Sequence, residues 1–243
     1  MLRPWLAALA LLGCGLISLI VYAWSVDFRA PEVVRGLAEG AANVRLEGIA
    51  MGLHSEAAEM RRAEVKRLRA EGASASRLLQ ARLGLADELR DAAVLAEAEG
   101  DLDLARKWLT ESAQAAPERV DLLCLLTDMR TRGADPEERR MAFLRLVYEH
   151  DAPCALLLAG ESFVEAGNSA ASRAYLERAV EGAPQWAGAR LALARLDLRQ
   201  SLPEAAVAGA SEAFQLAQDL PTRLRAAAVI EQAGGTAPPR WEI

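Results

Sequence analysis

The chain begins with one long apolar run and continues as shorter segments whose apolar residues recur every three or four positions. The run from Trp5 to Trp24 holds no charged residue, and about 20 helical residues rising roughly 1.5 Å each span the hydrocarbon layer of a bilayer. Trp5 lies at one end of the run, and Tyr22 and Trp24 lie at the other, as aromatic residues do at membrane interfaces. The pattern predicts an uncleaved transmembrane anchor over residues 1–26, with these three side chains at the two interfaces.

Two other fates of this segment stay open. Ala23-Trp24-Ser25 fits a small-x-small cleavage site, and cleavage there would release a secreted protein. Leu11–Cys14 imitates a lipoprotein cleavage box, but the apolar run continues beyond it where a polar tether is expected. The short N-terminus and the large domain that follows favour a cytoplasmic N-terminus, with the domain on the other side of the membrane.

Residues 27–72 are predicted to form a helical neck. A glycine-rich helix begins near Pro31, and a second helix runs from Ser55, a possible N-cap, to Ala70. Five basic residues lie on the second helix, and two interpretations of them stay open. They contact anionic lipid headgroups or an acidic partner, or they form a solvated helix face that nearby glutamates partly neutralise. These residues are Arg61, Arg62, Lys66, Arg67 and Arg69.

Beyond residue 72 the sequence repeats itself. Glu99–Pro117 aligns without a gap on Ala166–Pro184, and the distance between the two copies is about twice the ~34-residue period of a helix–turn–helix repeat. Gly100 and Gly167 occupy the same place in the two copies, where a left-handed residue ends a helix. We therefore predict a repeat domain over 73–234, with helix pairs over about 86–119, 120–152, 153–186 and 187–220, a capping helix over 221–234, and an extended tail over 235–243.

The repeated segments resemble the tetratricopeptide repeat (TPR) family. In the third unit the family's signature spacing is met by Leu156, Ala159, Gly160, Phe163, Ser172, Leu176, Ala179 and Pro184. The second unit departs from the pattern with an insertion-like Asp135-Pro136, and the fourth has Asp197-Leu198 where the family has an aromatic residue. The resemblance implies antiparallel helix pairs stacked into a right-handed superhelix with a concave peptide-binding groove. The predicted fold class is all-α: an N-terminal transmembrane helix, then an α-solenoid of about four TPR-like helix pairs with a C-terminal capping helix.

The resemblance also implies which side chains line the groove, because inward positions of each first helix face it in the family. Carried onto this chain, the candidate partner-binding residues are Arg90, Val94, Asp121, Asp128, Arg132, Leu157, Glu161, Val164, Leu191, Arg195 and Arg199. The family's carboxylate clamp for chaperone C-termini needs several Lys, Arg and Asn residues at set positions. The sequence lacks that pattern, so we do not expect that ligand.

Composition excludes some classes of partner. The net charge is −6, and the acidic excess lies in residues 86–243, whereas a nucleic-acid site needs a basic face. Nearly all basic residues are arginine, with lysine only at Lys66 and Lys107, which is typical of a GC-rich bacterial coding sequence. We expect no nucleic-acid partner.

Residues that could carry chemistry are few. His54 and His150 lie far apart and outside any metal-binding spacing, so we expect both to be exposed residues at helix ends. No nucleophile motif or glycine-rich phosphate loop is present, and we predict no catalytic, cofactor or metal site, no small-molecule substrate and no enzyme activity. Cys124 and Cys154 fall on the first helices of adjacent units. A disulfide is possible outside the cytoplasm, but two unpaired apolar side chains are the favoured interpretation.

Two functions remain. The first is a single-pass scaffold of the bacterial inner membrane whose periplasmic repeats bind other proteins, in assembly or quality control of a membrane or envelope complex. The alternative is a permanent accessory or structural subunit of a multi-subunit membrane complex. A secreted binder released by cleavage is a weaker third hypothesis.

Overall fold

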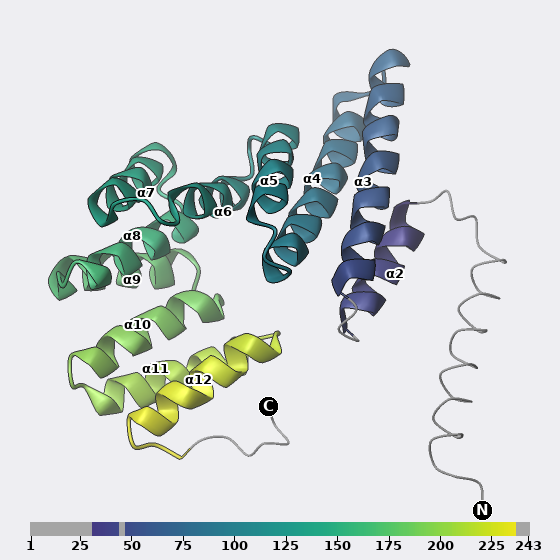
Figure 1. The fold of residues 1–243 in the computed structure, drawn as a ribbon. Helices are drawn as coiled ribbons and strands as arrows, with labels where there is room; N and C mark the ends of the chain where they lie inside the picture. The colour runs from purple at the N-terminus through teal and green to yellow at the C-terminus, as the bar shows by residue number, and fades with distance from the viewer. Residues whose placement is uncertain (1–30, 44–46, 237–243) are drawn as a thin grey trace, which may run out of the picture. The chain divides into compact units, whose positions relative to one another are not determined.

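The computed structural model describes residues 31–43 and 47–236, and within these ranges every regular element is an α-helix (Figure 1). The all-α prediction is therefore confirmed for this part of the chain. None of the helices in these ranges is long and apolar enough to cross a bilayer. The predicted anchor and its interfacial residues Trp5, Tyr22 and Trp24 lie outside the described residues, as does most of the predicted tail.

The chain forms two compact units, with the boundary between Pro117 and Glu118. The first unit contains α2 (Pro31–Asn43), α3 (Glu47–Ala70), α4 (Ala75–Ala98) and α5 (Leu102–Ala115). The second unit contains α6 (Val120–Thr131), α7 (Pro136–His150), α8 (Pro153–Glu165), α9 (Ser169–Gly182), α10 (Ala187–Arg199), α11 (Pro203–Leu216) and α12 (Leu220–Gln232).

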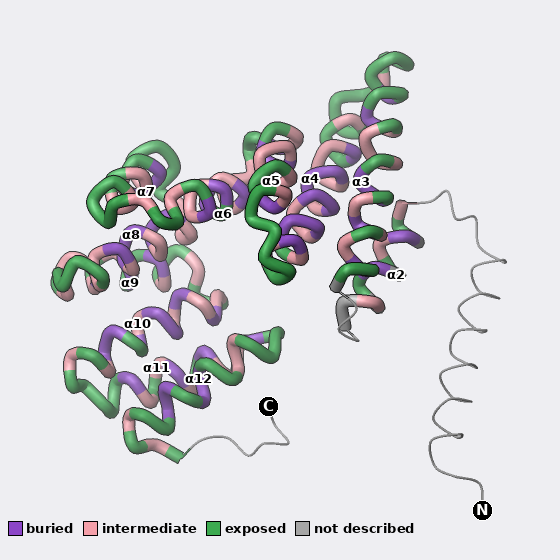
Figure 2. The backbone as a smooth tube through the Cα atoms, in the orientation of Figure 1, coloured by how far each residue is buried: buried purple, intermediate pink, exposed green. Residues whose placement is uncertain are grey.

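Within the second unit each helix contacts the next one along the chain, and α6, α8, α10 and α12 also contact one another in succession. These alternate contacts place the first helices of successive pairs side by side, as in a solenoid of helical hairpins. Figure 2 shows that the corners between the helices are mostly exposed, whereas buried positions recur along the helices.

Local capping explains the helix corners. Asp101 and Asn168 each accept a hydrogen bond of 3.0 Å from the backbone N–H three residues further on, at the start of α5 and α9. Gly100 and Gly167 have φ angles of +85° and +73°, which glycine adopts without steric cost. The predicted place of both glycines at corners is confirmed.

The interpretation of Asp135-Pro136 as an insertion is wrong, because these two residues begin α7. The Asp135 carboxylate accepts a hydrogen bond of 2.9 Å from the backbone N–H of Glu137. Pro136 takes the first helical position, where a missing N–H leaves no intrahelical bond unmade. The second unit of the sequence repeat is thus a regular helix pair.

Asp197, which replaces an expected aromatic residue, is a buried connector between two helices. Its carboxylate accepts a hydrogen bond from Arg173 of α9, and its backbone oxygen accepts one of 2.9 Å from Leu202 beyond the end of α10. The polar side chain is tolerated in the core because its hydrogen bonds are made inside the protein.

Small residues set the spacing of α8 and α9. A Cβ atom added at Gly160 would lie 2.7 Å from the Leu176 side chain and 3.3 Å from the backbone oxygen of Ser172. Since real carbon atoms do not approach so closely, the two helices can pack at this distance only with glycine at position 160.

The neck differs from its prediction. α3 begins at Glu47, so Ser55 lies inside the helix and does not cap it. His54 is 3% exposed, and its Nδ1 lies 2.8 Å from Oε2 of the fully buried Glu88 on α4. Arg35 of α2 approaches the other Glu88 oxygen at 3.8 Å and also lies 3.6 Å from Asp91. The expectation that His54 is an exposed helix-end residue is therefore wrong, whereas His150 does end α7 and is exposed.

Glutamates pair with three of the five basic residues of α3. Arg61 lies 2.7 Å from Glu32, Arg62 lies 2.7 Å from Glu111, and Arg67 lies 3.7 Å from Glu71. This pairing favours the interpretation of the cluster as a neutralised, solvated face.

α4 and the capping helix α12 each bury only some of their large apolar residues. Leu78 and Leu85 of α4 pack on the apolar side of α3, but Leu79 is exposed. On α12, Ile230 is buried against α10 and α11, whereas Leu224 faces solvent. The exposed leucines Leu79 and Leu224 thus lie outside the buried stripe of their helix.

A disulfide joins Cys124 of α6 to Cys154 of α8, whose Cα atoms are 6.3 Å apart. The favoured prediction of two unpaired cysteines is wrong. α6 and α8 contact each other directly, although α7 lies between them in the sequence. The sulfur of Cys154 also lies 3.8 Å from the backbone oxygen of Val120, at the start of α6. The start of α8 is thus fixed to the first half of α6.

Candidate functional site

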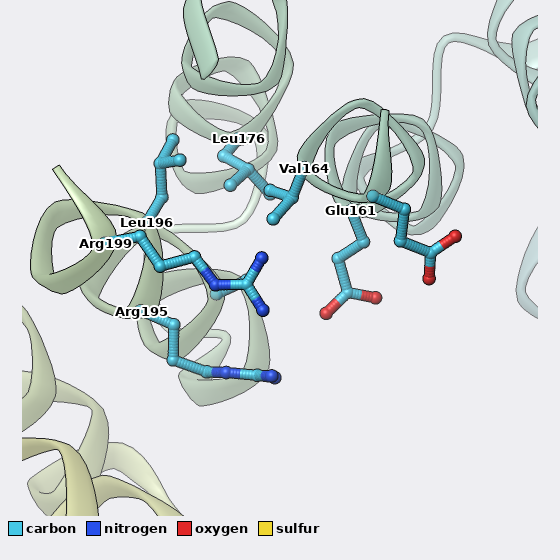
Figure 3. Close-up of a pocket in the computed structure, with 8 residues that line it drawn as sticks. Glu161, Val164, Leu176, Arg195, Leu196 and Arg199 are labelled. Carbon is cyan, nitrogen blue, oxygen red and sulfur yellow. The ribbon is translucent and has the colours of Figure 1, made fainter. Parts of the chain in front are cut away.

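The candidate site is a pocket of about 150 Å³ in the second unit, between α8, α9 and α10 (Figure 3). It is lined by Glu161, Val164, Glu165, Leu176, Ala192, Arg195, Leu196 and Arg199. Four of the predicted partner-binding residues are brought together here, namely Glu161, Val164, Arg195 and Arg199.

Two rows of opposite charge face each other across the pocket. Glu161 and Glu165 lie one turn apart on α8, and Arg195 and Arg199 lie one turn apart on α10. Because α8 and α10 are first helices of successive pairs and contact each other, the carboxylates and the guanidinium groups border the same space. In Figure 3 the Arg195 and Arg199 side chains extend from α10 into the pocket, on the side opposite Glu161.

The floor between the rows is apolar. Leu176 of α9 and Leu196 of α10 are buried in one cluster with Ala192, and Val164 of α8 packs against this cluster half-buried. Leu176 reaches the floor from a second helix, in the space that Gly160 leaves open. A charged group bound between the rows would therefore lie next to an apolar surface.

The two guanidinium groups form no ion pair with another residue that the structure describes. Arg195 and Arg199 are exposed, and neither makes a hydrogen bond or an ion pair within 4.0 Å in the described part of the chain. Glu161 is half-buried and likewise accepts no hydrogen bond from a described residue. Burial raises the pKa of the Glu161 carboxyl group, and the nearby positive charge of Arg195 opposes that rise.

Glu165 differs from Glu161 because it already has a partner. Its two oxygens accept hydrogen bonds of 3.0 and 3.1 Å from Nη1 of Arg139 on α7. The same guanidinium donates a bond of 2.9 Å through Nη2 to Asp128 of α6, which also accepts one of 3.0 Å from Arg132. Asp128 and Arg132, both predicted groove residues, are thus part of an ion-pair network and do not line the pocket.

The remaining predicted groove residues lie elsewhere. Leu191 is only 5% exposed and belongs to the core formed with α11 and α12, while Leu157 packs half-buried beside the floor of the pocket. Asp121 accepts a hydrogen bond of 2.6 Å from Arg119.

Two further candidates, Arg90 and Val94, belong to the first unit and are not part of the pocket. Arg90 is paired with Asp87 and Asp91, and Val94 is exposed on α4.

The sequence prediction missed half of the lining. Glu165 could have been found, because it follows Glu161 by one helical turn. Leu176 could not, because it comes from a second helix that the family pattern places behind the groove. Ala192 and Leu196 were passed over because an apolar residue on a predicted first helix looks like core.

The lining residues can bind a ligand but suggest no reaction. Carboxylates, guanidinium groups and aliphatic side chains recognise a partner by ion pairing, hydrogen bonding and apolar contact. Within residues 31–43 and 47–236, no group of three or more His, Cys, Asp and Glu side chains could hold a metal ion.

No protein-family model matches the chain, and no curated protein sequence matches it either. Solved structures do match in fold. TTC0263, a thermophilic TPR protein of Thermus thermophilus, has a TM-score of 0.56 at 17% identity, covering 83% of this chain and 100% of that one. Yeast Tom70 has a TM-score of 0.53 at 17% identity, covering 88% of this chain and 42% of Tom70. PilF of Pseudomonas aeruginosa has a TM-score of 0.50 at 16% identity, covering 86% of this chain and 88% of PilF.

Proposed function

We propose that this chain, whose helical part has the tetratricopeptide-repeat fold, is a scaffold that binds segments of other proteins in the pocket between α8 and α10. One observation carries the proposal. Three charged side chains from two neighbouring helices border an apolar floor, and none of the three is paired with another described residue. Ligand sites are typically concave and combine an apolar lining with a few placed polar groups, and this pocket has both features.

We further propose that the N-terminal segment anchors the scaffold in a bacterial inner membrane with the helical units in the periplasm. The uncharged run from Trp5 to Trp24 supports the anchor. The Cys124–Cys154 disulfide supports the compartment, because disulfides form and persist in the periplasm and are reduced in the cytosol. In that setting the scaffold would serve the assembly or quality control of an envelope complex.

The compartment can be tested with two reporter fusions placed after Thr236. Alkaline phosphatase fused there is expected to be active, and β-galactosidase fused at the same place is expected to be inactive. The opposite pair of activities would refute the periplasmic location. A carbonate wash of the membranes tests the anchor, because a single-pass protein stays in the pellet.

Partner binding can be tested by photo-crosslinking in cells. A benzophenone amino acid at Val164, in the pocket, is expected to yield adducts with other proteins. The same amino acid at Arg145, an exposed residue of α7 that does not line the pocket, serves as the matched control. Equal adducts from both positions, or none from position 164, would contradict the proposed binding site.

A permanent structural subunit is the second candidate, and an apolar surface on α7 favours it. Tyr148 is 91% exposed, and Met141 lies on the same face two turns earlier, also exposed. Extraction in a mild detergent followed by mass spectrometry separates the two functions. A stoichiometric set of co-purifying membrane proteins identifies a permanent subunit, and many substoichiometric ones identify a transient scaffold.

A further inference from the structure

Arg195 and Arg199 combine two properties: they line the pocket, and they make no ion pair with another described residue. Arg173, Arg178 and Arg190 of the same unit each pair with a carboxylate from another part of the fold. Arg195 and Arg199 have no such partner among the described residues, although they lie across from α8. Their guanidinium groups are therefore available to a ligand.

The unpaired charges in the pocket favour a negatively charged ligand. Glu165 is held by Arg139, so the pocket's groups without a partner in the described ranges are two guanidiniums and the carboxylate of Glu161. A carboxylate placed between Arg195 and Arg199 gains two charge-assisted contacts, while Glu161 repels it from the α8 side and so directs it toward α10. A cationic ligand would meet one carboxylate and two like charges.

The size and the apolar floor of the pocket indicate how large the bound group is and which side chain lies next to the acidic group. A volume of about 150 Å³ is below the roughly 300–1,000 Å³ of pockets that hold a whole small molecule. It suits one or two side chains of a longer chain that runs along the surface. Val164 and Leu196 provide an apolar surface beside the guanidinium groups, so the side chain next to the acidic group should be aliphatic.

We infer that the pocket binds an acidic–apolar segment of a partner polypeptide, with an Asp or Glu carboxylate between Arg195 and Arg199 and an adjacent aliphatic side chain on the floor formed by Val164 and Leu196. This inference rests on the proposed function, since it names the kind of segment that the scaffold holds. Glu161 acts as a specificity residue that disfavours a second acidic group on the α8 side.

The test uses the full chain, purified in mild detergent, as the target for a phage library of random 12-residue peptides. Selected peptides are expected to place Asp or Glu beside Leu, Ile or Val. The same selection against Arg195→Glu/Arg199→Glu is expected to return Lys or Arg beside the aliphatic residue. Arg145→Glu on α7 is the matched control, because it changes an exposed arginine outside the pocket that no described residue pairs with.

One selected acidic peptide, labelled with fluorescein, is then measured by fluorescence anisotropy. Its affinity is expected to fall at least about tenfold in the double variant, since contacts to a charged group are worth that much. It should stay unchanged in Arg145→Glu and increase a few-fold in Glu161→Gln. Circular dichroism checks that each variant is folded. We expect the double variant to fold, because Arg195 and Arg199 are exposed.

The failures of the inference and of the proposed function can be distinguished. If peptides are selected but carry no acidic residue, or bind the double variant equally well, the inference is wrong while peptide binding stands. If no peptide is selected at all, the proposed function fails with it. A dimer of the chain that depends on Arg195 would show that a second copy fills the pocket, and this would also overturn the inference.

Discussion

The disulfide between α6 and α8 allows a quantitative prediction. It closes a loop whose ends are 30 positions apart in the sequence. In the chain-entropy description, a cross-link that closes a loop of this length restricts the unfolded chain. The reduced protein is therefore expected to be less stable than the oxidised one by about 3.5 kcal/mol. Reduction should not open a cavity, since Cys124 stays packed beside Leu146 and Ala155.

Urea unfolding of the full chain in mild detergent, followed by circular dichroism, measures this effect. Dithiothreitol is expected to lower the midpoint of the transition that includes the second unit. The shift should be roughly 1.5–2 M if the slope is about 2 kcal/mol per molar urea. The double variant Cys124→Ser/Cys154→Ser is the control, because it should unfold at the lower midpoint whether or not the reductant is present.

Two outcomes would refute this reasoning. A midpoint that does not move with dithiothreitol would show that the cross-link contributes little to stability. Membranes can be quenched with acid and the protein then labelled with a maleimide. Free thiols at both positions would show that the bond does not form in the cell. The second result would also remove the main support for the periplasmic location.

Three further predictions concern packing, backbone strain and capping, and all are measured by urea unfolding. Gly160→Ala should destabilise the protein by about 1–3 kcal/mol because its methyl group overlaps a neighbouring helix, whereas Gly52→Ala, with open space around it in α3, should stabilise it by about 0.5–1 kcal/mol. Ser201→Gly should stabilise by about 0.5 kcal/mol, since Ser201 has a left-handed φ of 58°; a loss of stability would contradict the strain. Asp219→Ala should cost about 1 kcal/mol at pH 7 by uncapping α12. Burial alone would raise the pKa of Asp219, but the hydrogen bond from Thr222 lowers it below its ordinary value of 3.8. The contribution of this carboxylate is therefore present above that value and lost as the pH falls through the lower folded-state pKa, so the difference between Asp219→Ala and the parent should vanish in acid.

The parts of the fold that could be predicted from the sequence are those that depend on neighbouring residues. Gly100 and Gly167 end helices by local backbone geometry, and Asn168 caps the helix that follows it, so both signals are legible in a short window. Asp135-Pro136 was equally local but was misread, because comparison with the other units suggested an insertion where the residues form a regular helix start.

The parts that could not be predicted depend on which helices meet and in what register. His54 looked like a surface residue because nothing near it in the sequence shows that Glu88, 34 positions away, covers it. The pairing of Cys124 with Cys154 required the register of α6 against α8. In the pocket, the resemblance to the repeat family pointed to Glu161, Arg195 and Arg199. Glu165, one helical turn after Glu161, was missed, and Leu176 enters from a second helix that the resemblance did not assign to the groove.

The cross-link between α6 and α8 also changes how the protein would respond to mechanical load. If the chain is pulled from its two ends, tension passes from Cys124 through the sulfur atoms to Cys154, and α7 is bypassed. The fully stretched oxidised chain is then shorter than the reduced one by about 100 Å, at roughly 3.5 Å for each of the 30 intervening steps. If the scaffold is tethered at one end and pulled by its partner at the other, α7 would thus bear no tension while the rest of the unit does.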